Sequence, residues 1–480
     1  MSPAEIYAQA VKAHLSGASA AAEALCEQVA AQDPAHVGAL YMMGVIGHAS
    51  GRSERARRLL RRAAAIVPAD GRPYAHLGLA LAALGKPDEA VAAFRRASRL
   101  SGDAPWIRRK LGELLLRRQR PADAAAALRT AVCLMPDDHL ATSRLAQALA
   151  MVRADEEAGR AYRRAIALDP GDAGSALALG HVLLRNGRLG EAYVCYERRF
   201  EMPGYPVQRP VFAVPEWDGA PLAGRTLLLY AERDFGDTLQ HLRFANSVPK
   251  AGGRIVVECQ PELAALAAGM PAVDAVVVQG GTRPPFDAHA AIAALPRFLD
   301  PAVETLGAGV PYLTAAPRRD LVPAVPGVLS VGLVWAGRPG ANRACPLGAL
   351  APLLEVEGAS FHALQVGEAA AQIGALPRPE RLRDLAPFIH GFADTAGIMA
   401  VLDLVVTIDT AAVHLAGALG RPTWLLLGTP GAYRWQMAGP TTPWYPTVRL
   451  FRQPAPGDWE GLGRRVANAL AKVLAGRRAA

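Results

Sequence analysis

The stretch Leu402–Thr423 combines residue types and an order that suit phosphate binding. Apolar residues run up to Asp409, Thr410 and Ala411 follow directly, and His414 comes four residues after Thr410. We predict a buried strand that ends at Asp409 and a helix that begins at once, with Thr410 and His414 on one face. The first amides of a helix are unpaired and lie at its positive end, so Thr410 and Ala411 could hold a phosphate. A purely structural unit, with His414 hydrogen-bonded in the core, also fits the local sequence.

A second stretch, Tyr230–Gln240, runs in the same way from an apolar strand through a glycine into a helix. Gly236 would let a ligand approach the backbone closely. Asp237 and Thr238 begin the predicted helix, which extends to about Val248. Asp237 is then either the N-cap, which residue type alone favours, or a carboxylate aimed into a cleft.

Both stretches need parallel sheets to position them, and the chain after residue 206 has the pattern of an α/β protein. Short apolar segments alternate with helical ones, which is typical of parallel strands joined by helices. Ligands in such sheets bind at the carboxyl ends of the strands. The predicted strands are Thr226–Glu232, Arg254–Cys259, Asp274–Val278, Val328–Trp335, Ser360–Val366, Leu404–Ile408 and Thr423–Leu427, and a helix at about Trp459–Leu474 closes the structure.

The α/β region divides into two predicted sheets. A proline-rich linker at 207–223 precedes a first domain at 224–318. The stretch Pro311–Val328, with four prolines, is the predicted crossing point to a second domain at 319–480.

The first 206 residues repeat with a period of 34. Small residues hold this step at Ala56, Ala90, Ala124, Ala158 and Ala192, and glycines hold it at Gly44, Gly78, Gly112 and Gly180. Small residues let two helices approach closely, and prolines such as Pro68 end the second helix of each pair. The pattern resembles tetratricopeptide repeats, with five clear units from about residue 37 and a weaker one before them. We therefore predict an α-solenoid over 1–206, which provides a binding surface and no chemistry of its own.

The repeat register predicts which side chains line the concave groove of the solenoid. These positions suit a protein partner or acceptor segment that is acidic or rich in hydrogen-bonding groups. A solvated polar face is the alternative. The predicted groove residues are Tyr41, His76, Arg109, Lys110, Arg144 and His181.

The composition of the 480-residue chain favours a folded protein. It is 51% hydrophobic and 20% charged, with a net charge of +9 that arises largely from arginines on the repeats. No recognised nucleic-acid-binding module accompanies these arginines, so no nucleic-acid partner is predicted. The five cysteines have no paired spacing, which predicts neither a zinc site nor disulfides. We find no leader and no apolar run of membrane-spanning length, and predict a cytoplasmic protein without a transmembrane segment.

Residues 215–475 resemble the ADP-heptose–lipopolysaccharide heptosyltransferases (glycosyltransferase family 9), and more closely their tetratricopeptide-fused bacterial relatives. The resemblance rests on Gly236–Thr238 and on the run Asp409–Gly420. Supporting segments are Gly332–Gly337, Phe392–Ala396, Arg434–Trp435, Trp444–Pro446 and Arg449–Phe451. The family implies two Rossmann-like domains that face each other (the GT-B fold), with a nucleotide sugar held by the C-terminal one.

The resemblance also implies roles for individual residues. Asp237 matches the family's proposed catalytic base, and no metal or other cofactor is expected. The groups implied to bind the donor and its phosphates are Gly236, Thr238, Arg343, Asp409, Thr410, Ala411 and His414. The loop around Arg343 is less polar than in relatives, and Ala432 and Tyr433 stand where relatives carry an acidic residue.

The resemblance implies an inverting, metal-independent glycosyltransferase. It would move a sugar from a nucleotide-sugar donor to a protein or glycan acceptor that the repeats recruit. The alternative is a catalytically degenerate, glycosyltransferase-like scaffold or interaction protein.

Overall fold

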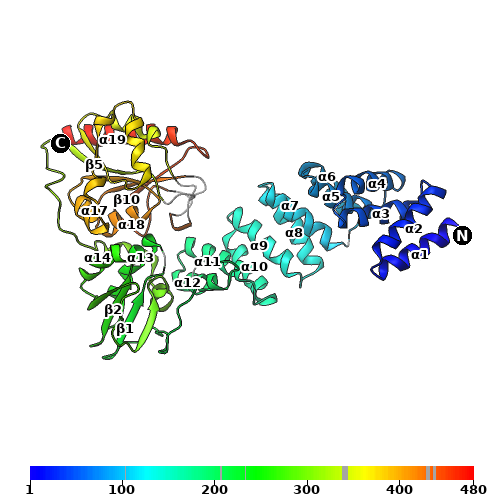
Figure 1. The fold of residues 1–480 in the computed structure, drawn as a ribbon, viewed down its shortest axis with the longest axis horizontal. Helices are drawn as coiled ribbons and strands as arrows, with labels where there is room; N and C mark the ends of the chain where they lie inside the picture. Colours follow the sequence, from blue (N-terminus) through cyan, green and yellow to red (C-terminus); the bar gives the residue numbers. More distant parts are fainter. Residues whose placement is uncertain are drawn as a thin grey trace. The chain divides into compact units, whose positions relative to one another are not determined.

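The computed structural model, drawn in Figure 1, describes residues 1–102, 104–205, 208–232, 234–337, 344–428, 433–435 and 439–479. The chain divides into two compact units, Met1–Val182 and Leu183–Ala480, which we call the repeat unit and the α/β unit. The division falls inside helix α11 (Ala173–Arg185), so the end of α11 and the helix after it belong to the α/β unit. The predicted domain boundaries at 206, 223 and 318 stay predictions.

Twelve helices in the described part of residues 1–200 form a tetratricopeptide solenoid, as predicted. Odd-numbered helices begin exactly 34 residues apart, and so do even-numbered ones, including the weaker first pair. The helices are α1 (Pro3–Leu15), α2 (Ser19–Gln32), α3 (Val37–Ala49), α4 (Ser53–Ile66), α5 (Gly71–Ala83), α6 (Pro87–Leu100), α7 (Pro105–Arg117), α8 (Pro121–Leu134), α9 (His139–Met151), α10 (Asp155–Leu168), α11 and α12 (Leu189–Tyr196).

The repeating glycines are places where two helices of a pair touch. A Cβ atom on Gly44 would lie 2.6 Å from Cγ of Leu60, and one on Gly112 would lie 2.4 Å from Cγ of Leu128. Both leucines are fully buried, so they have no room to move aside. The 34-residue period therefore records a steric requirement inside each repeat.

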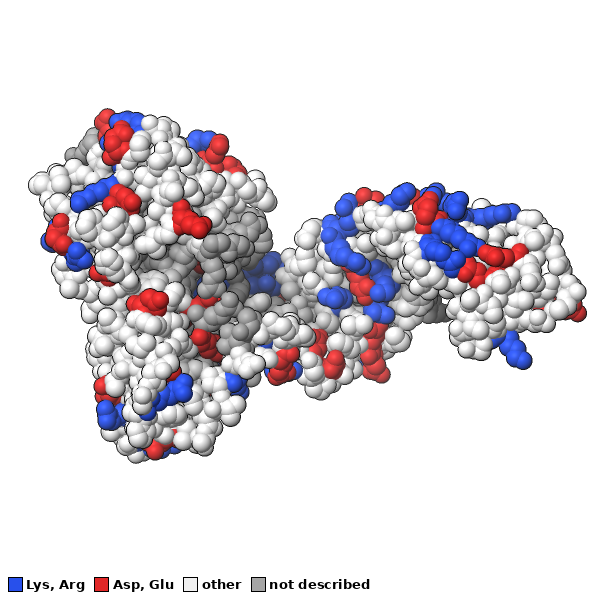
Figure 2. Space-filling model, viewed as in Figure 1, with Lys and Arg blue, Asp and Glu red and all other residues white. Residues whose placement is uncertain are grey.

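Arginines of the repeat unit pair with acidic residues of the neighbouring repeat. Arg61 contacts Glu89 and Arg129 contacts Glu157, each at 2.7 Å and each across 28 residues of sequence. Figure 2 shows Lys and Arg side chains interspersed with Asp and Glu on one face of this unit. Many of the basic side chains are thus neutralised by partners within the solenoid.

Two parallel sheets form the centre of the α/β unit. The first has the order β3-β2-β1-β4 and the second the order β10-β9-β8-β5-β6-β7, with every pairing parallel. The strands are β1 (Thr226–Tyr230), β2 (Arg254–Cys259), β3 (Ala275–Val278), β4 (Ala288–Ala291), β5 (Leu329–Val334), β6 (Ala359–Ala363), β7 (Leu382–Asp384), β8 (Leu404–Ile408), β9 (Thr423–Leu427) and β10 (Val448–Arg452).

Helices follow most of these strands. The α-helices are α13 (Phe235–His241), α14 (Ala264–Ala268), α15 (Leu295–Leu299), α16 (Ala351–Leu354), α17 (Phe392–Met399), α18 (Ala411–Ala418) and α19 (Trp459–Ala479). Short 3₁₀ helices are η1 (Glu197–Glu201), η2 (Leu242–Ser247), η3 (Pro261–Leu263), η4 (Ile292–Ala294), η5 (Val303–Gly309), η6 (Leu347–Leu350), η7 (Glu368–Ala375), η8 (Pro379–Arg381), η9 (Ala386–Phe388) and η10 (Tyr433–Trp435).

The prediction of parallel sheets is confirmed, and each of the seven predicted strands has a counterpart in the structure. The segment 310–328 contains no strand and joins the first sheet to the second. Three strands were missed: β4, β7 and β10. The predicted helix from Asp237 to Val248 is instead α13, which begins at Phe235, followed by the 3₁₀ helix η2.

Candidate functional site

Each sheet of the α/β unit has one point where the chain reverses its direction of strand addition. In the first sheet this point lies between β1 and β4, and in the second between β5 and β8. The loops that leave neighbouring strands at such a point run to opposite sides and open a crevice beyond their carboxyl ends. Asp237 follows β1, and Asp409 follows β8 directly. The topology therefore positions both predicted stretches where parallel sheets bind ligands.

A cleft of about 630 Å³ lies at these strand ends. Gly236 and Asp237 line it from the first sheet's side, and Asp409, Thr410 and Ala411 line it from the second. Its other lining residues are Asp234, Phe235, Glu262, Val334, Ala336, Gly337, Leu364, Gln365, Val366, Ile389, His390, Gly391, Phe392, Thr395, Ala412, His414 and Arg434. Its size and mixed lining suit a small-molecule ligand.

Helices α13 and α18 meet at the base of this cleft and bring its two sides together (Figure 1). A Cβ atom on Gly236 would lie 3.0 Å from Cδ2 of His414. Gly236 is therefore needed for contact between the two helices as well as for lining the cleft. The sequence had suggested only that Gly236 lets a ligand approach the backbone.

Asp237 is the third residue of α13, so the capping interpretation is wrong. The N-cap position is Asp234, whose side chain makes no capping hydrogen bond. The carboxylate of Asp237 instead accepts a hydrogen bond from Arg434, with Nη1 3.1 Å from Oδ1. The carboxylate is thus directed into the cleft, the second of the two predicted possibilities.

One guanidinium nitrogen joins three groups at the centre of the site. Nη1 of Arg434 also donates to Oε1 of Gln240 at 2.8 Å and lies 3.4 Å from Nε2 of His414. Burial is the largest single influence and acts to raise the pKa of the Asp237 carboxyl. The charge and hydrogen bond of Arg434, together with the neighbouring His241 and His414, outweigh it and hold the pKa below its ordinary value. Asp237 is therefore ionised at neutral pH.

His414 lies on α18 and is 2% exposed. Burial, together with the charge of Arg434, holds the pKa of His414 well below its ordinary value, so the imidazole is neutral. Its Nδ1 is 3.0 Å from the hydroxyl of Tyr445, and its ring stacks on Trp435 at 5.4 Å. His414 is therefore hydrogen-bonded in the core and also lines the cleft, and its predicted place beside a phosphate stays a prediction.

The first turn of α18 is capped by Thr410, not by Asp409. Oγ1 of Thr410 accepts a hydrogen bond from the amide of Ala412 at 3.3 Å. A Cβ atom on Gly337, after β5, would lie 3.0 Å from Cγ2 of Thr410. The backbone after β5 thus closely approaches the start of α18, and the small residues Gly337, Ala411 and Ala412 line the cleft there.

Of the predicted phosphate ligands, Thr238 does not join this group, and Arg343 cannot be placed. Thr238 is 3% exposed, and its hydroxyl donates to the carbonyl of Asp234 at 3.2 Å and contacts Gln260 at 3.3 Å. It lines a separate cavity of about 140 Å³, because its position on α13 faces the first sheet. Arg343 lies outside the described residues, so its predicted contact stays a prediction.

Several residues of the site were missed as functional groups by the sequence analysis. Arg434 was quoted only as part of the resemblance, and Gln240, His241 and Tyr445 were given no role. His241 is buried, with its Nδ1 2.8 Å from the carbonyl of Asp237 and its Nε2 bonded to the hydroxyl of Tyr193. These side chains come from distant segments, and no local pattern marks their convergence.

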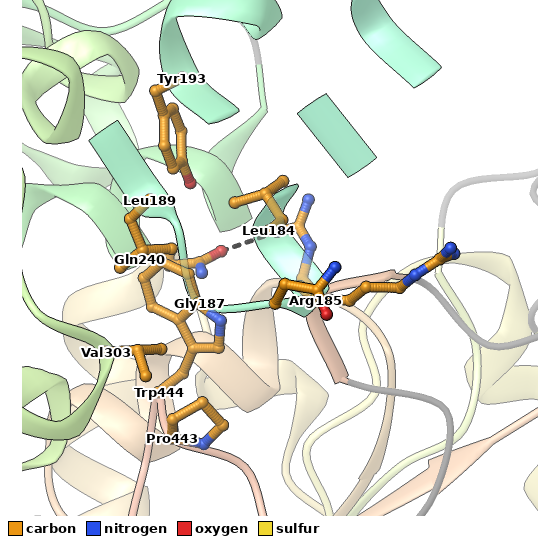
Figure 3. Close-up of a pocket in the computed structure, with 11 residues that line it drawn as sticks. Leu184, Arg185, Gly187, Leu189, Tyr193, Gln240, Val303, Pro443 and Trp444 are labelled. Carbon is orange, nitrogen blue, oxygen red and sulfur yellow. Dashed lines mark hydrogen bonds between the residues drawn. The ribbon is translucent and has the colours of Figure 1, made fainter. Parts of the chain in front are cut away.

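Arg434 also lines a smaller cavity of about 220 Å³, which is drawn in Figure 3. Gln240 and Trp444 line it together with the turn between α11 and α12, around Gly187. The dashed line in Figure 3 is the hydrogen bond that Gln240 accepts from Arg434. Arg434 therefore lines both this cavity and the larger cleft.

The predicted groove residues of the solenoid lie on α3, α5, α7, α9 and α11. The His76 ring packs between Tyr41 at 5.4 Å and Trp106 at 5.6 Å. Nε of Arg109 lies 3.1 Å from the carboxylate of Asp138. Lys110 pairs with Glu113, Arg144 donates to Gln147, and His181 is exposed. Arg109 and Lys110 thus already have acidic partners in the solenoid, and a role in binding stays a prediction.

The described residues contain neither a metal-ligand cluster nor a membrane-spanning helix. No cluster of three or more His, Cys, Asp or Glu side chains there could hold a metal ion. No helix among them is both long enough and apolar enough to cross a membrane.

Comparison with known proteins identifies the first part of the chain. The tetratricopeptide repeat family matches residues 13–80, 76–139 and 109–173. Similar solved structures include MamA from Desulfovibrio magneticus RS-1, which is 24% identical with a TM-score of 0.31 over 34% of this chain and 90% of MamA. YrrB, a TPR protein with an unusual peptide-binding site, is 18% identical with a TM-score of 0.35 over 37% of this chain and 91% of YrrB. The N-terminal part therefore consists of tetratricopeptide repeats.

A curated relative extends beyond the repeats. Protein FlbA of Caulobacter vibrioides is 30% identical in an alignment of 333 residues that covers 60% of this chain and 53% of FlbA. The chain thus spans about half the length of that relative.

Proposed function

We propose that the α/β unit is a GT-B glycosyltransferase that transfers a sugar from a nucleotide-sugar donor to a hydroxyl acceptor with inversion and without a metal. The observation that carries this proposal is the meeting of Asp237 and the start of α18 in one cleft at the reversal points of two parallel sheets. Nη1 of Arg434 lies within 3.4 Å of both Asp237 and His414. The proposed base, Asp237, and the proposed phosphate-binding start of α18 thus line the same cleft and could contact the same ligand.

The reaction follows from these two groups. Asp237 would take the proton of the acceptor hydroxyl as the hydroxyl oxygen attacks the anomeric carbon of the donor sugar. The bond from that carbon to the diphosphate breaks, and the nucleoside diphosphate leaves with the electron pair. Backbone amides at Thr410 and Ala411 would stabilise the charge that grows on the leaving group. Attack from the side opposite the leaving group inverts the anomeric centre.

The solenoid would supply the acceptor. Tetratricopeptide repeats present extended surfaces that bind protein partners. We propose that the face with Tyr41, His76, Arg109, Lys110, Arg144 and His181 binds the acceptor protein or a partner that delivers it.

A second candidate is an interaction protein whose α/β unit binds a ligand without turning it over. The ion pair between Asp237 and Arg434 favours it, because a carboxylate paired with a guanidinium is a weak base. Donor binding is common to both candidates, and transfer or slow hydrolysis of the donor separates them.

Titration calorimetry of the full chain against a panel of nucleotide sugars tests the proposal. We expect at least one to bind, with retention of binding by the exposed-site control Ala375→Glu on η7. Ala411→Glu puts a carboxylate at the start of α18 and should weaken binding by at least about tenfold. Absence of binding across the panel, or equal affinities of the two variants, would contradict the proposal.

A further inference from the structure

Arg434 is the single Lys or Arg among the described residues that line the large cleft. Four carboxylates line the same cleft: Asp234, Asp237, Glu262 and Asp409. In the ligand-free protein, Arg434 pairs with one of them, Asp237. Among the described lining residues, carboxylates therefore outnumber basic side chains four to one.

A diphosphate entering such a cleft faces repulsion from these carboxylates. Amides at the start of α18 offset part of this repulsion, but they carry only about half a unit charge. A guanidinium binds phosphate oxygens through two parallel hydrogen bonds, and the Nη1 atom that contacts Oδ1 of Asp237 is one of the donors it would use. A bound diphosphate is thus a strong competitor for Arg434.

The side chain of Arg434 has room to change partners. It is 19% exposed and borders both the 630 Å³ cleft and the 220 Å³ cavity. Its contacts with Asp237, Gln240 and His414 all use one nitrogen, Nη1. A small rotation of the guanidinium would therefore break these contacts together.

We propose that Arg434 exchanges between Asp237 and the diphosphate of the donor, so that the base is released only when a donor is bound. This inference rests on the proposed function. In the free protein the ion pair keeps Asp237 a weak base. When the diphosphate takes the guanidinium, the proton affinity of Asp237 rises, and the same movement adds positive charge to the leaving group. One residue thereby couples donor binding to activation of the acceptor.

Binding measurements alone test the exchange. The probes are inorganic pyrophosphate and the diphosphates UDP, GDP and ADP, titrated into the full chain by calorimetry. The proteins are the parent, Asp237→Asn, Arg434→Gln and the double variant. Arg378→Gln, at an exposed arginine on the rim of the second sheet that pairs with Glu355, is the matched control and should bind like the parent.

Exchange predicts an asymmetric result. Asp237→Asn frees Arg434 and should tighten diphosphate binding by about tenfold, whereas Arg434→Gln should weaken it by about tenfold. In the double variant, the gain from Asp237→Asn should shrink to about twofold, since only relief of repulsion remains. Arg434→Lys keeps the charge without the two-pronged geometry and should bind with intermediate affinity.

Each other outcome overturns the inference in a distinguishable way. If Asp237→Asn tightens binding equally with and without Arg434, the two residues do not compete and the exchange is wrong, although the donor site stands. If no diphosphate binds to any of the proteins while their melting temperatures match the parent's, the donor site itself is wrong and the exchange falls with it.

Discussion

The repeat unit and the α/β unit bring charged side chains together in different ways. In the repeat unit, pairs such as Arg61–Glu89 and Arg129–Glu157 recur at one sequence separation and remain about half exposed. In the α/β unit, Asp237 and Arg434 are 197 residues apart and meet at a cleft beside buried histidines. The first arrangement is periodic and screened by solvent, and the second is unique and partly buried.

This difference indicates which of the two units can shift the proton affinity of a side chain. Exposed ion pairs contribute little energy and hold no group in an unusual state. Burial next to a fixed charge shifts proton affinities, as it does for Asp237 and His414. Substitutions of equal size should therefore have small effects on the repeats and large, specific effects in the cleft.

The largest expected effect is that of Asp237→Asn. Removal of a general base should reduce the transfer rate by about 10²- to 10⁴-fold, while the nucleotide sugar still binds. Transfer to the acceptor, or slow hydrolysis of the donor, is the measurement. Glu304→Gln, an exposed carboxylate on η5 of the same unit, is the control and should keep the parent's rate. Equal rates for Asp237→Asn and the parent would remove Asp237 from the mechanism.

The pH dependence of stability compares a partly buried histidine of the repeat unit with a buried one of the α/β unit. Burial lowers the pKa of His76 and of His241 from 6.5 to about 4. The unfolded chain then binds protons more readily than the folded one between these values. The contribution of each neutral histidine to the free energy of unfolding is therefore fully present above pH 6.5 and is lost as the pH falls toward about 4.

Hydrogen exchange between pH 7 and 4.5 measures this loss in each unit separately. His76→Phe keeps a ring between Tyr41 and Trp106 and should flatten the pH dependence of α3, α5 and α7 alone. A parallel change around His241 in that variant, or an unchanged slope in the repeats, would contradict the assignment.

A matched pair of glycines tests the steric origin of the period. Gly112→Ala pushes a Cβ atom into the buried Leu128 and should destabilise the repeats by about 1–3 kcal/mol. Gly159, on α10, has no atom closer than 3.6 Å to such a Cβ, so Gly159→Ala should stabilise them by up to about 1 kcal/mol. Thermal unfolding measures both. Shifts of the same sign would mean that close approach does not explain the repeating glycines.

The smallest expected effect is that of Glu89→Gln, which breaks the exposed pair with Arg61. Such pairs are screened by solvent, so the free energy of unfolding should fall by less than about 1 kcal/mol. Urea unfolding measures it. A loss of several kcal/mol would show that cross-repeat charges hold the solenoid together.

The solenoid was the most predictable part of the fold because its packing repeats. Ala56, Gly44 and their equivalents allow two helices to pack closely in each repeat, so their spacing alone predicts the helices. Long apolar strands such as β5 and β8 were also predictable. The missed strand β4 reads Ala-His-Ala-Ala, and its small side chains do not distinguish it from a helix or loop. It forms because it pairs with β1, a contact that no local pattern records.

The candidate site could be predicted where it depends on one strand and the helix after it. Thr410, Ala411 and His414 all belong to the start of the helix that follows β8, and all three line the cleft. The partner of Asp237 could not be predicted, because Arg434 reaches it from η10, which follows β9 of the second sheet. Thr238 was misplaced for a local reason, since the next residue along a helix points about 100° away from Asp237.

The most direct test of the central claim is a crystal structure of the full chain with the nucleoside diphosphate that binds tightest. We expect the diphosphate within hydrogen-bond distance of the amides at the start of α18, with the guanidinium of Arg434 on its oxygens and away from Asp237. A diphosphate bound elsewhere on the chain, or in the cleft with the Asp237–Arg434 pair intact and no contact to α18, would contradict it.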